Sequence, residues 1–128
     1  MPLTSVAVET RRATERHEIR GRATAHFPRI GLHAPVRNVS TGGFAVEAPR
    51  TFEIDTVHDV VFRHGRFVIP AIRARVVHTY FLEERHGVSL HVIGLEFLTA
   101  HDDGFRRTLN ALFRELGLFV DDQSPSRD

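Results

Sequence analysis

The feature that most constrains the fold is a close, regular series of short β-prone segments separated by turn residues. The candidate strands cover residues 22–27, 33–39, 43–48, 56–63, 67–72, 74–81 and 89–98. Strands this short and this closely spaced favour an antiparallel barrel or sandwich over βαβ units. Apolar and polar side chains alternate within residues 44–47 and 95–97, as in strands with one face in water. An all-β core is therefore predicted for residues 22–98.

The hydrophobic pattern changes its period after residue 100. A helix is predicted over residues 102–117, because apolar side chains recur there at intervals of three and four. Asp102 and Asp103 are suited to cap its start, and Gly117 is suited to end it. The helix is expected to pack over a barrel end or a sheet face through the apolar residues Phe105, Leu109, Leu112, Phe113 and Leu116.

The chain of 128 residues is expected to form one domain, over residues 11–118. Residues 1–10 show no periodic pattern and are predicted to be a flexible N-terminus. Residues 119–128 are mostly polar, include a proline, and are predicted to be a disordered tail. No internal repeat or long linker divides the chain.

Composition excludes several kinds of chemistry. Cysteine is absent, so disulfides, thiolate metal sites and cysteine nucleophiles are excluded. The nine histidines show none of the tight spacings that zinc sites use, and no metal site is expected. A net charge of +1 is low for a general nucleic-acid binder, which neutralises many phosphates. With no apolar run near the roughly 18 residues of a membrane span and no signal peptide, we expect a cytoplasmic protein without membrane insertion.

Two polar motifs indicate a binding site. Arg12 and Arg16 precede the first candidate strand, and Asn38, Ser40 and Gly43 lie where one strand gives way to the next. Arginine forks recognise phosphates and guanine edges. Short polar side chains beside a glycine turn can meet the rest of such a ligand, because the missing Cβ lets it approach the backbone. The two motifs predict a site for a small, anionic, guanine-containing ligand.

The order of these motifs resembles the signature of the PilZ domain family, the bacterial receptors for cyclic di-GMP. In that family an Arg-x-x-x-Arg segment leads into a barrel that carries an Asp/Asn-x-Ser-x-x-Gly motif. Residues 74–78 (Ala-Arg-Val-Val-His) are similar to the family's central apolar strand, and residues 94–97 (Gly-Leu-Glu-Phe) to its closing strand. The resemblance implies a six-stranded antiparallel split barrel with a C-terminal helix. It also implies an arginine switch segment over residues 11–21, which wraps over the barrel when ligand binds.

The resemblance assigns a role to each motif residue. Arg12 and Arg16 would grip guanine N7 and O6 atoms and phosphate oxygens. Asn38 and Ser40 would hydrogen-bond the other guanine's edge and the neighbouring phosphate, while Gly43 leaves room at the barrel surface. Asn38 stands where aspartate is the commoner residue. The loss of charge-assisted hydrogen bonds at this position is expected to weaken binding without abolishing it.

Three further residues are expected as additional contacts: Arg11, Gly42 and His78. A basic residue at the position of Arg11 goes, in this family, with binding of a stacked ligand dimer. His78 follows a strand where relatives carry an aromatic residue near the nucleotide, so it would stack on guanine. Arg16 and Arg20 form a second Arg-x-x-x-Arg. We choose Arg12 and Arg16 because Arg11 completes the family's doubled arginine.

The function implied by the resemblance is a cyclic di-GMP receptor that relays the messenger's level to an unidentified protein partner. It would control motility, exopolysaccharide or biofilm formation, and it would use no cofactor besides its ligand. Enzymatic activity is not expected, because the Gly-x-Ser-x-Gly elbow is absent and no base pairs with Ser40. One alternative is a PilZ-fold adaptor that works by protein contact without nucleotide. Another is a barrel that binds single-stranded nucleic acid, although one tyrosine and no tryptophan offer few stacking platforms.

Overall fold

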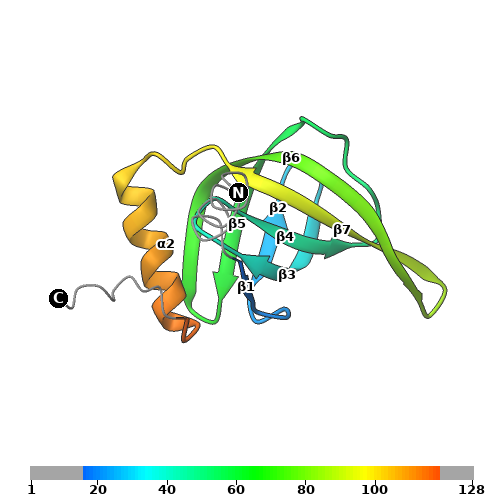
Figure 1. The fold of residues 1–128 in the computed structure, drawn as a ribbon, viewed down its shortest axis with the longest axis horizontal. Helices are drawn as coiled ribbons and strands as arrows, with labels where there is room; N and C mark the ends of the chain where they lie inside the picture. Colours follow the sequence, from blue (N-terminus) through cyan, green and yellow to red (C-terminus); the bar gives the residue numbers. More distant parts are fainter. Residues whose placement is uncertain (1–15, 119–128) are drawn as a thin grey trace, which may run out of the picture.

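The computed structural model describes residues 16–118, which form a closed ring of antiparallel strands with one helix beside it (Figure 1). The elements are β1 (His17–Glu18), β2 (Thr24–Phe27), β3 (Leu32–Val39), β4 (Gly43–Ala48), β5 (Val57–His64), β6 (Phe67–Arg85), β7 (Val88–Phe97) and α2 (Asp103–Glu115). The strands pair in the order β1-β3-β2-β5-β6-β7-β4. A further pairing between β3 and β4 closes the six strands from β2 through β7 into a barrel. The predicted barrel with a C-terminal helix is confirmed.

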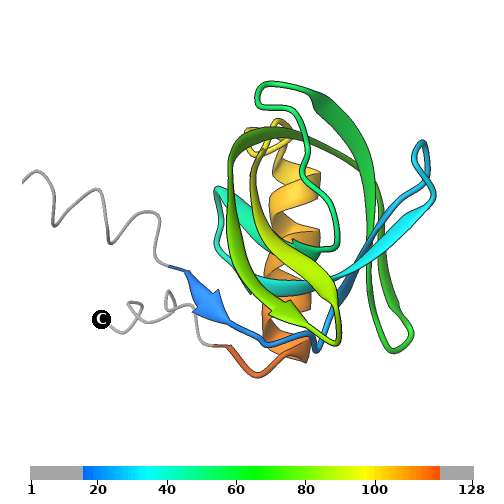
Figure 2. The ribbon, with the colours of Figure 1, turned by 90° about the vertical axis from the view of Figure 1, so that its right-hand side faces the viewer.

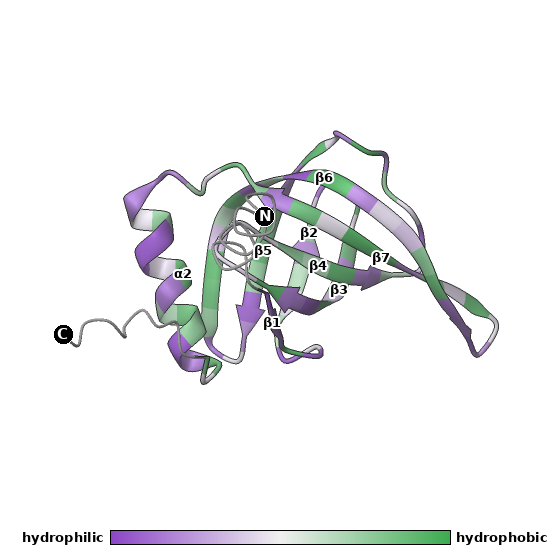
Figure 3. Cartoon of the chain, viewed as in Figure 1, coloured by the Kyte–Doolittle hydropathy of each residue, from purple (hydrophilic) through white to green (hydrophobic). Residues whose placement is uncertain are grey.

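The barrel interior is filled by apolar side chains from the strands. Hydrophobic and hydrophilic residues are interleaved along the strands in Figure 3. Phe44 and Val46 of β4 are fully buried in this core. The ring centroid of Phe44 lies 4.8 Å from that of Phe62 and 5.3 Å from that of Phe97. Burying one such side chain contributes about 1.5–3 kcal/mol. In β4, the alternate residues Phe44 and Val46 therefore turn toward the core, as the sequence pattern predicts.

Helix α2 closes one end of the barrel, across the far end of the ring in Figure 2. Asp102 caps its start, since the carboxylate Oδ1 accepts a hydrogen bond of 2.9 Å from the backbone N–H of Phe105. Gly117 follows its end with a φ of 77°, a value that favours glycine. The helix joins the barrel core through the buried side chains of Leu109, Leu112, Phe113 and Leu116. The predicted helix, its start and its end are confirmed.

The prediction of two strands over residues 67–72 and 74–81 is wrong, because one continuous strand, β6, covers both. Its first part pairs with β5 and its second part with β7, so a single bent strand serves two neighbours. Ala71, with a φ of 61°, allows the bend without breaking the strand. The connection between the strands predicted over residues 74–81 and 89–98 is only a turn at His86 and Gly87, whose positive φ values suit a two-residue hairpin. Beyond the barrel, residues 81–90 form a two-stranded hairpin arm (Figure 1).

Candidate ligand-binding site

A hydrogen bond joins the two motifs predicted to bind ligand. The Nη1 atom of Arg16 donates to Oδ1 of Asn38 over 2.9 Å. Strand β1 makes this possible, because its register on β3 places His17 opposite Val39 and Glu18 opposite Asn38. Partial burial of the Arg16 guanidinium lowers its pKa from the ordinary value, yet arginine stays charged at neutral pH. The structure thus brings a cation and an amide from segments far apart in sequence into contact.

The second half of the Asn-x-Ser-x-x-Gly motif (residues 38–43) forms the tight turn between β3 and β4. Ser40 is only 2% exposed, and its Oγ accepts hydrogen bonds from the backbone N–H groups of Gly42 (3.1 Å) and Gly43 (3.2 Å). The backbone N–H of Ser40 donates to the carbonyl of Gly43 over 2.8 Å. The hydroxyl therefore stabilises the turn, and the expected contacts of Ser40 and Gly42 with ligand stay predictions.

Gly43 is required by the packing of the barrel itself. A Cβ atom at this position would lie 2.2 Å from the carbonyl oxygen of Leu95 and 3.0 Å from Cα of Glu96. Strand β7 thus passes too close to β4 for any side chain here. The room that the sequence suggested for a ligand is taken by a neighbouring strand, and a direct ligand contact of Gly43 stays a prediction.

His78 belongs to the same outer row of the barrel as Asn38. The strand registers pair Asn38 with Ala45, Ala45 with Gly94, and Gly94 with His78, which spans about 14 Å at the usual strand spacing. The His78 ring lies over Gly94, where a Cβ would come within 2.2 Å of its Cε1 atom. It also stacks near Tyr80, with 6.0 Å between ring centroids. The side chain is exposed, and its stacking on guanine stays a prediction.

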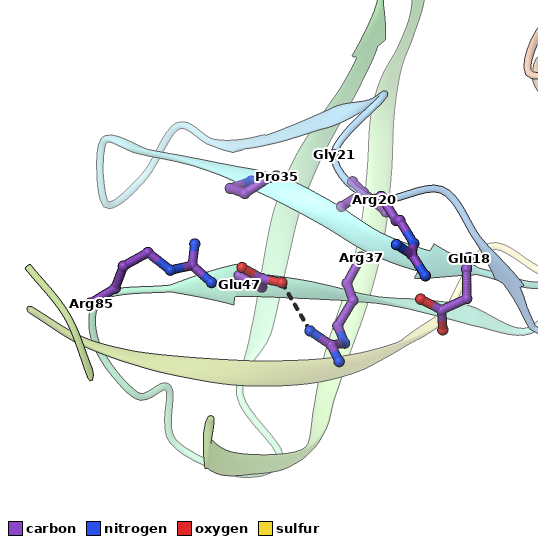
Figure 4. A pocket seen from close by; sticks show the side chains of 8 residues that line it. Glu18, Arg20, Gly21, Pro35, Arg37, Glu47 and Arg85 are labelled. Carbon is purple, nitrogen blue, oxygen red and sulfur yellow. Dashed lines mark hydrogen bonds and ion pairs between the residues drawn. The ribbon is translucent and has the colours of Figure 1, made fainter. Parts of the chain in front are cut away.

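A polar pocket of about 550 Å³ is lined in part by Glu18, the residue that pairs with Asn38 across β1 and β3 (Figure 4). Sequence reasoning missed most of it, although the alternative Arg-x-x-x-Arg spacing pointed at Arg20. Its lining comes from the segment before β2, from β3 and β4, and from the hairpin arm, and comprises Glu18, Arg20, Gly21, Pro35, Val36, Arg37, Glu47 and Arg85. Three guanidinium groups and two carboxylates give this lining a net charge of +1.

Two backbone irregularities shape this pocket. Arg20 and Gly21 have φ values of 49° and 80°, so the chain bends between β1 and β2. Opposite the bend, the β3–β4 register shifts between Val36 and Asn38, which leaves Arg37 as the extra residue of a bulge. The N–H groups of Ile19 and Arg20 both donate to the carbonyl oxygen of Arg37, over 3.1 and 3.3 Å. These two hydrogen bonds fix the bend against the bulge.

The charged groups of the pocket differ in how they are held. Nη1 of Arg37 donates to Oε2 of Glu47 over 2.9 Å, and both side chains are partly buried. Arg85 pairs with Glu83 of the same strand. Within residues 16–118, Arg20 and Glu18 form no ion pair within 4.0 Å and both are exposed. These two side chains are the ones most available to a ligand.

Two predicted contacts, Arg11 and Arg12, lie outside the described residues. Within residues 16–118, no group of three histidine or acidic side chains is placed to hold a metal ion. No helix in the described part of the chain is long and apolar enough to span a bilayer.

Comparison with known proteins supports the fold. Two solved structures match over 80% of this chain, and the chain spans about half the length of each. One is the MrkH–c-di-GMP complex of K. pneumonia, with 17% identity and a TM-score of 0.62 over 51% of that chain. The other, MrkH described as a novel c-di-GMP-dependent transcription regulatory factor, has 15% identity and a TM-score of 0.59 over 49% of that chain. At these identities the likeness concerns the fold alone.

A search of curated proteins found no match. The family model described as the PilZ domain matches residues 10–115, which include both polar motifs and all the described strands. With six strands closed into a ring and a helix across one end, the chain belongs to the PilZ domain family.

Proposed function

We propose that this protein is a non-enzymatic receptor for cyclic di-GMP whose binding surface is centred on Arg16 and Asn38. The observation that carries the proposal is the hydrogen bond of 2.9 Å between these two side chains, which joins the two signature motifs in space. Membership of the PilZ family and the likeness to the MrkH–c-di-GMP complex support the same ligand.

The donors of Arg16 fit the proposed ligand. A guanidinium carries five N–H donors, and the bond to Asn38 uses one of them. Among residues 16–118 the others form no further hydrogen bond, and they can form the fork that matches guanine N7 and O6 or a phosphate. Arg12 and Arg11 would add to this grip from the preceding segment. The wrapped segment would change the surface that a protein partner meets, and so relay the messenger's level.

Calorimetric titration of the full chain with cyclic di-GMP, with GTP and cyclic GMP as controls, tests the proposal. Selective binding in the micromolar range or tighter is expected. Arg16→Ala should lower the affinity by about tenfold or more, equivalent to about 1.4 kcal/mol. Arg29→Ala is the matched control, because Arg29 lies in the turn at the opposite end of β3 and, within residues 16–118, its ion pair is a loose one of 3.8 Å with Asp59. Full affinity in Arg16→Ala would remove this residue from the site.

A nucleotide-independent adaptor is the second candidate. The hairpin arm favours it, because Phe81 and Val88 are 59% and 45% exposed there. Contiguous exposed apolar patches mark protein contact surfaces, and these two side chains would contribute to one on the arm. Absence of binding heat from a folded sample would favour this function, and partner capture that depends on Phe81 would support it. The process controlled, whether motility, exopolysaccharide or biofilm formation, follows from the identity of that partner.

A further inference from the structure

The Arg16–Asn38 pair leaves one requirement of a guanine ligand unmet. The Watson–Crick edge of guanine offers two adjacent donors, N1–H and the N2 amino group, so its site must supply two acceptors. Asn38 has one carbonyl oxygen with two lone pairs, and one of them already accepts from Arg16. Its amide nitrogen is a donor and would face the guanine donors unfavourably. A neighbouring side chain with two acceptor oxygens side by side would meet this requirement.

Glu18 is placed to be that acceptor. It lies directly opposite Asn38 in the β1–β3 pairing, and residues paired in this way project from the same face with Cβ atoms about 4.5–5.5 Å apart. The side chain is exposed and, among residues 16–118, forms no ion pair within 4.0 Å. An ionised carboxylate offers two oxygens side by side, which match two adjacent N–H donors.

The rest of the pocket supplies the complementary donors. Figure 4 shows the side chains of Glu18 from β1, Arg20 from the bend and Arg37 from β3 directed toward one another. Glu47 occupies one N–H of Arg37, and the remaining donors of that guanidinium have no side-chain partner within residues 16–118. Two carboxylates would weaken a site for a bare anion. A mixed lining with a net charge of +1 suits a group that carries N–H donors, a carbonyl oxygen and one phosphate.

We propose that Glu18 selects guanine, by accepting hydrogen bonds from N1–H and the N2 amino group, while Arg20 and Arg37 donate to O6 and a phosphate oxygen. The inference rests on the proposed cyclic di-GMP function and adds to it the residue that distinguishes guanine from adenine. Adenine has no hydrogen at N1 and no amino group at C2, so it offers neither donor to Glu18.

The test compares cyclic di-GMP with cyclic di-AMP on the full chain, for the wild type, Glu18→Gln and the control Glu115→Gln. Glu115 is an exposed carboxylate at the end of α2. In Glu18→Gln, the affinity for cyclic di-GMP should fall about tenfold or more, as expected for loss of a bidentate base contact. The affinity for cyclic di-AMP should stay level or rise, because a negative charge near the phosphates is removed. Glu115→Gln should change neither affinity.

The direction in which Glu18→Gln changes the two affinities decides whether Glu18 selects guanine. If Glu18 acted only through its charge, Glu18→Gln would raise both affinities by the same factor, and this result would overturn the inference while the proposed receptor function stands. An unchanged ratio between the two ligands would do the same. Absence of binding of either dinucleotide by the folded wild type would overturn both. Thermal unfolding of each variant confirms that the exposed substitutions leave the fold intact.

Discussion

The two halves of the Asn-x-Ser-x-x-Gly motif have different structural roles, although they are adjacent in sequence. Asn38 is partly exposed and contacts Arg16, which comes from another segment. Ser40 is buried and hydrogen-bonds within its own turn, while Gly43 makes room for β7. The contrast teaches that a signature motif can combine residues that are accessible to a ligand with residues that shape the surface beside them. Each half should respond differently to substitution, in stability or in affinity.

The largest effect is expected on stability, at Gly43. Gly43→Ala would place a Cβ 2.2 Å from the carbonyl oxygen of Leu95, so strand β7 must move. We expect the free energy of unfolding to fall by about 3 kcal/mol or more. Gly42→Ala is the matched control, because its Cβ would meet nothing closer than Ser40 Oγ at 3.9 Å. Chemical denaturation of both variants measures the difference, and equal stability would contradict the packing role of Gly43.

Ser40→Ala should give the next largest loss. Two backbone N–H groups in the turn would lose their acceptor, which costs about 1–3 kcal/mol for buried groups. Affinity for cyclic di-GMP, measured where the variant is fully folded, should change much less than in Arg16→Ala. A loss of affinity without loss of stability would instead make Ser40 a ligand contact.

Substitutions in the Arg16–Asn38 pair should instead lower binding affinity and leave stability nearly unchanged. Arg16→Ala removes an exposed hydrogen bond, so the free energy of unfolding should change by less than about 1 kcal/mol. The binding loss of Arg16→Ala and Asn38→Ala should be coupled, with the double variant differing from the sum by about 0.5 kcal/mol or more. Strict additivity in a double-mutant cycle of calorimetric affinities would show that the two side chains act independently.

The smallest effect is expected at His58, away from both halves of the motif. Burial, together with the charges of Arg50 and Arg29, lowers the pKa of His58 below 6.5 in the folded protein. The unfolded chain therefore binds a proton more readily, and stability should decline as the pH falls below about 6.5. His58→Gln should flatten this decline in thermal unfolding while cyclic di-GMP affinity stays unchanged. A parallel change in affinity would link this side of the barrel to the site.

Much of the fold could be predicted because its signals are local. The bounds of β4 and the cap of α2 at Asp102 follow from alternation, helical period and capping preference within a few residues. The single strand β6 could not be predicted from local signals, because its continuity depends on pairing with β5 and then with β7. A positive φ at Ala71 has no signature in the sequence.

The candidate site could be predicted only in part. The motif residues Arg16 and Asn38 are recognisable from spacing, and the structure brings them together. The pocket beside them depends on a bend at Arg20 meeting a bulge at Arg37, and neither is visible before the strands are paired. The burial of Ser40 has the same origin, since its side-chain environment is set by strands distant in sequence.

The most direct test of this account is a map of backbone amide chemical shifts during titration of the full chain with cyclic di-GMP. The largest changes are expected at residues 16–21 and 37–43, which hold Arg16, Glu18, Arg20 and Asn38. Small changes are expected at Arg29 and along α2. Binding that leaves residues 16–21 and 37–43 unchanged, or that perturbs the hairpin arm alone, would contradict the placement of the ligand site.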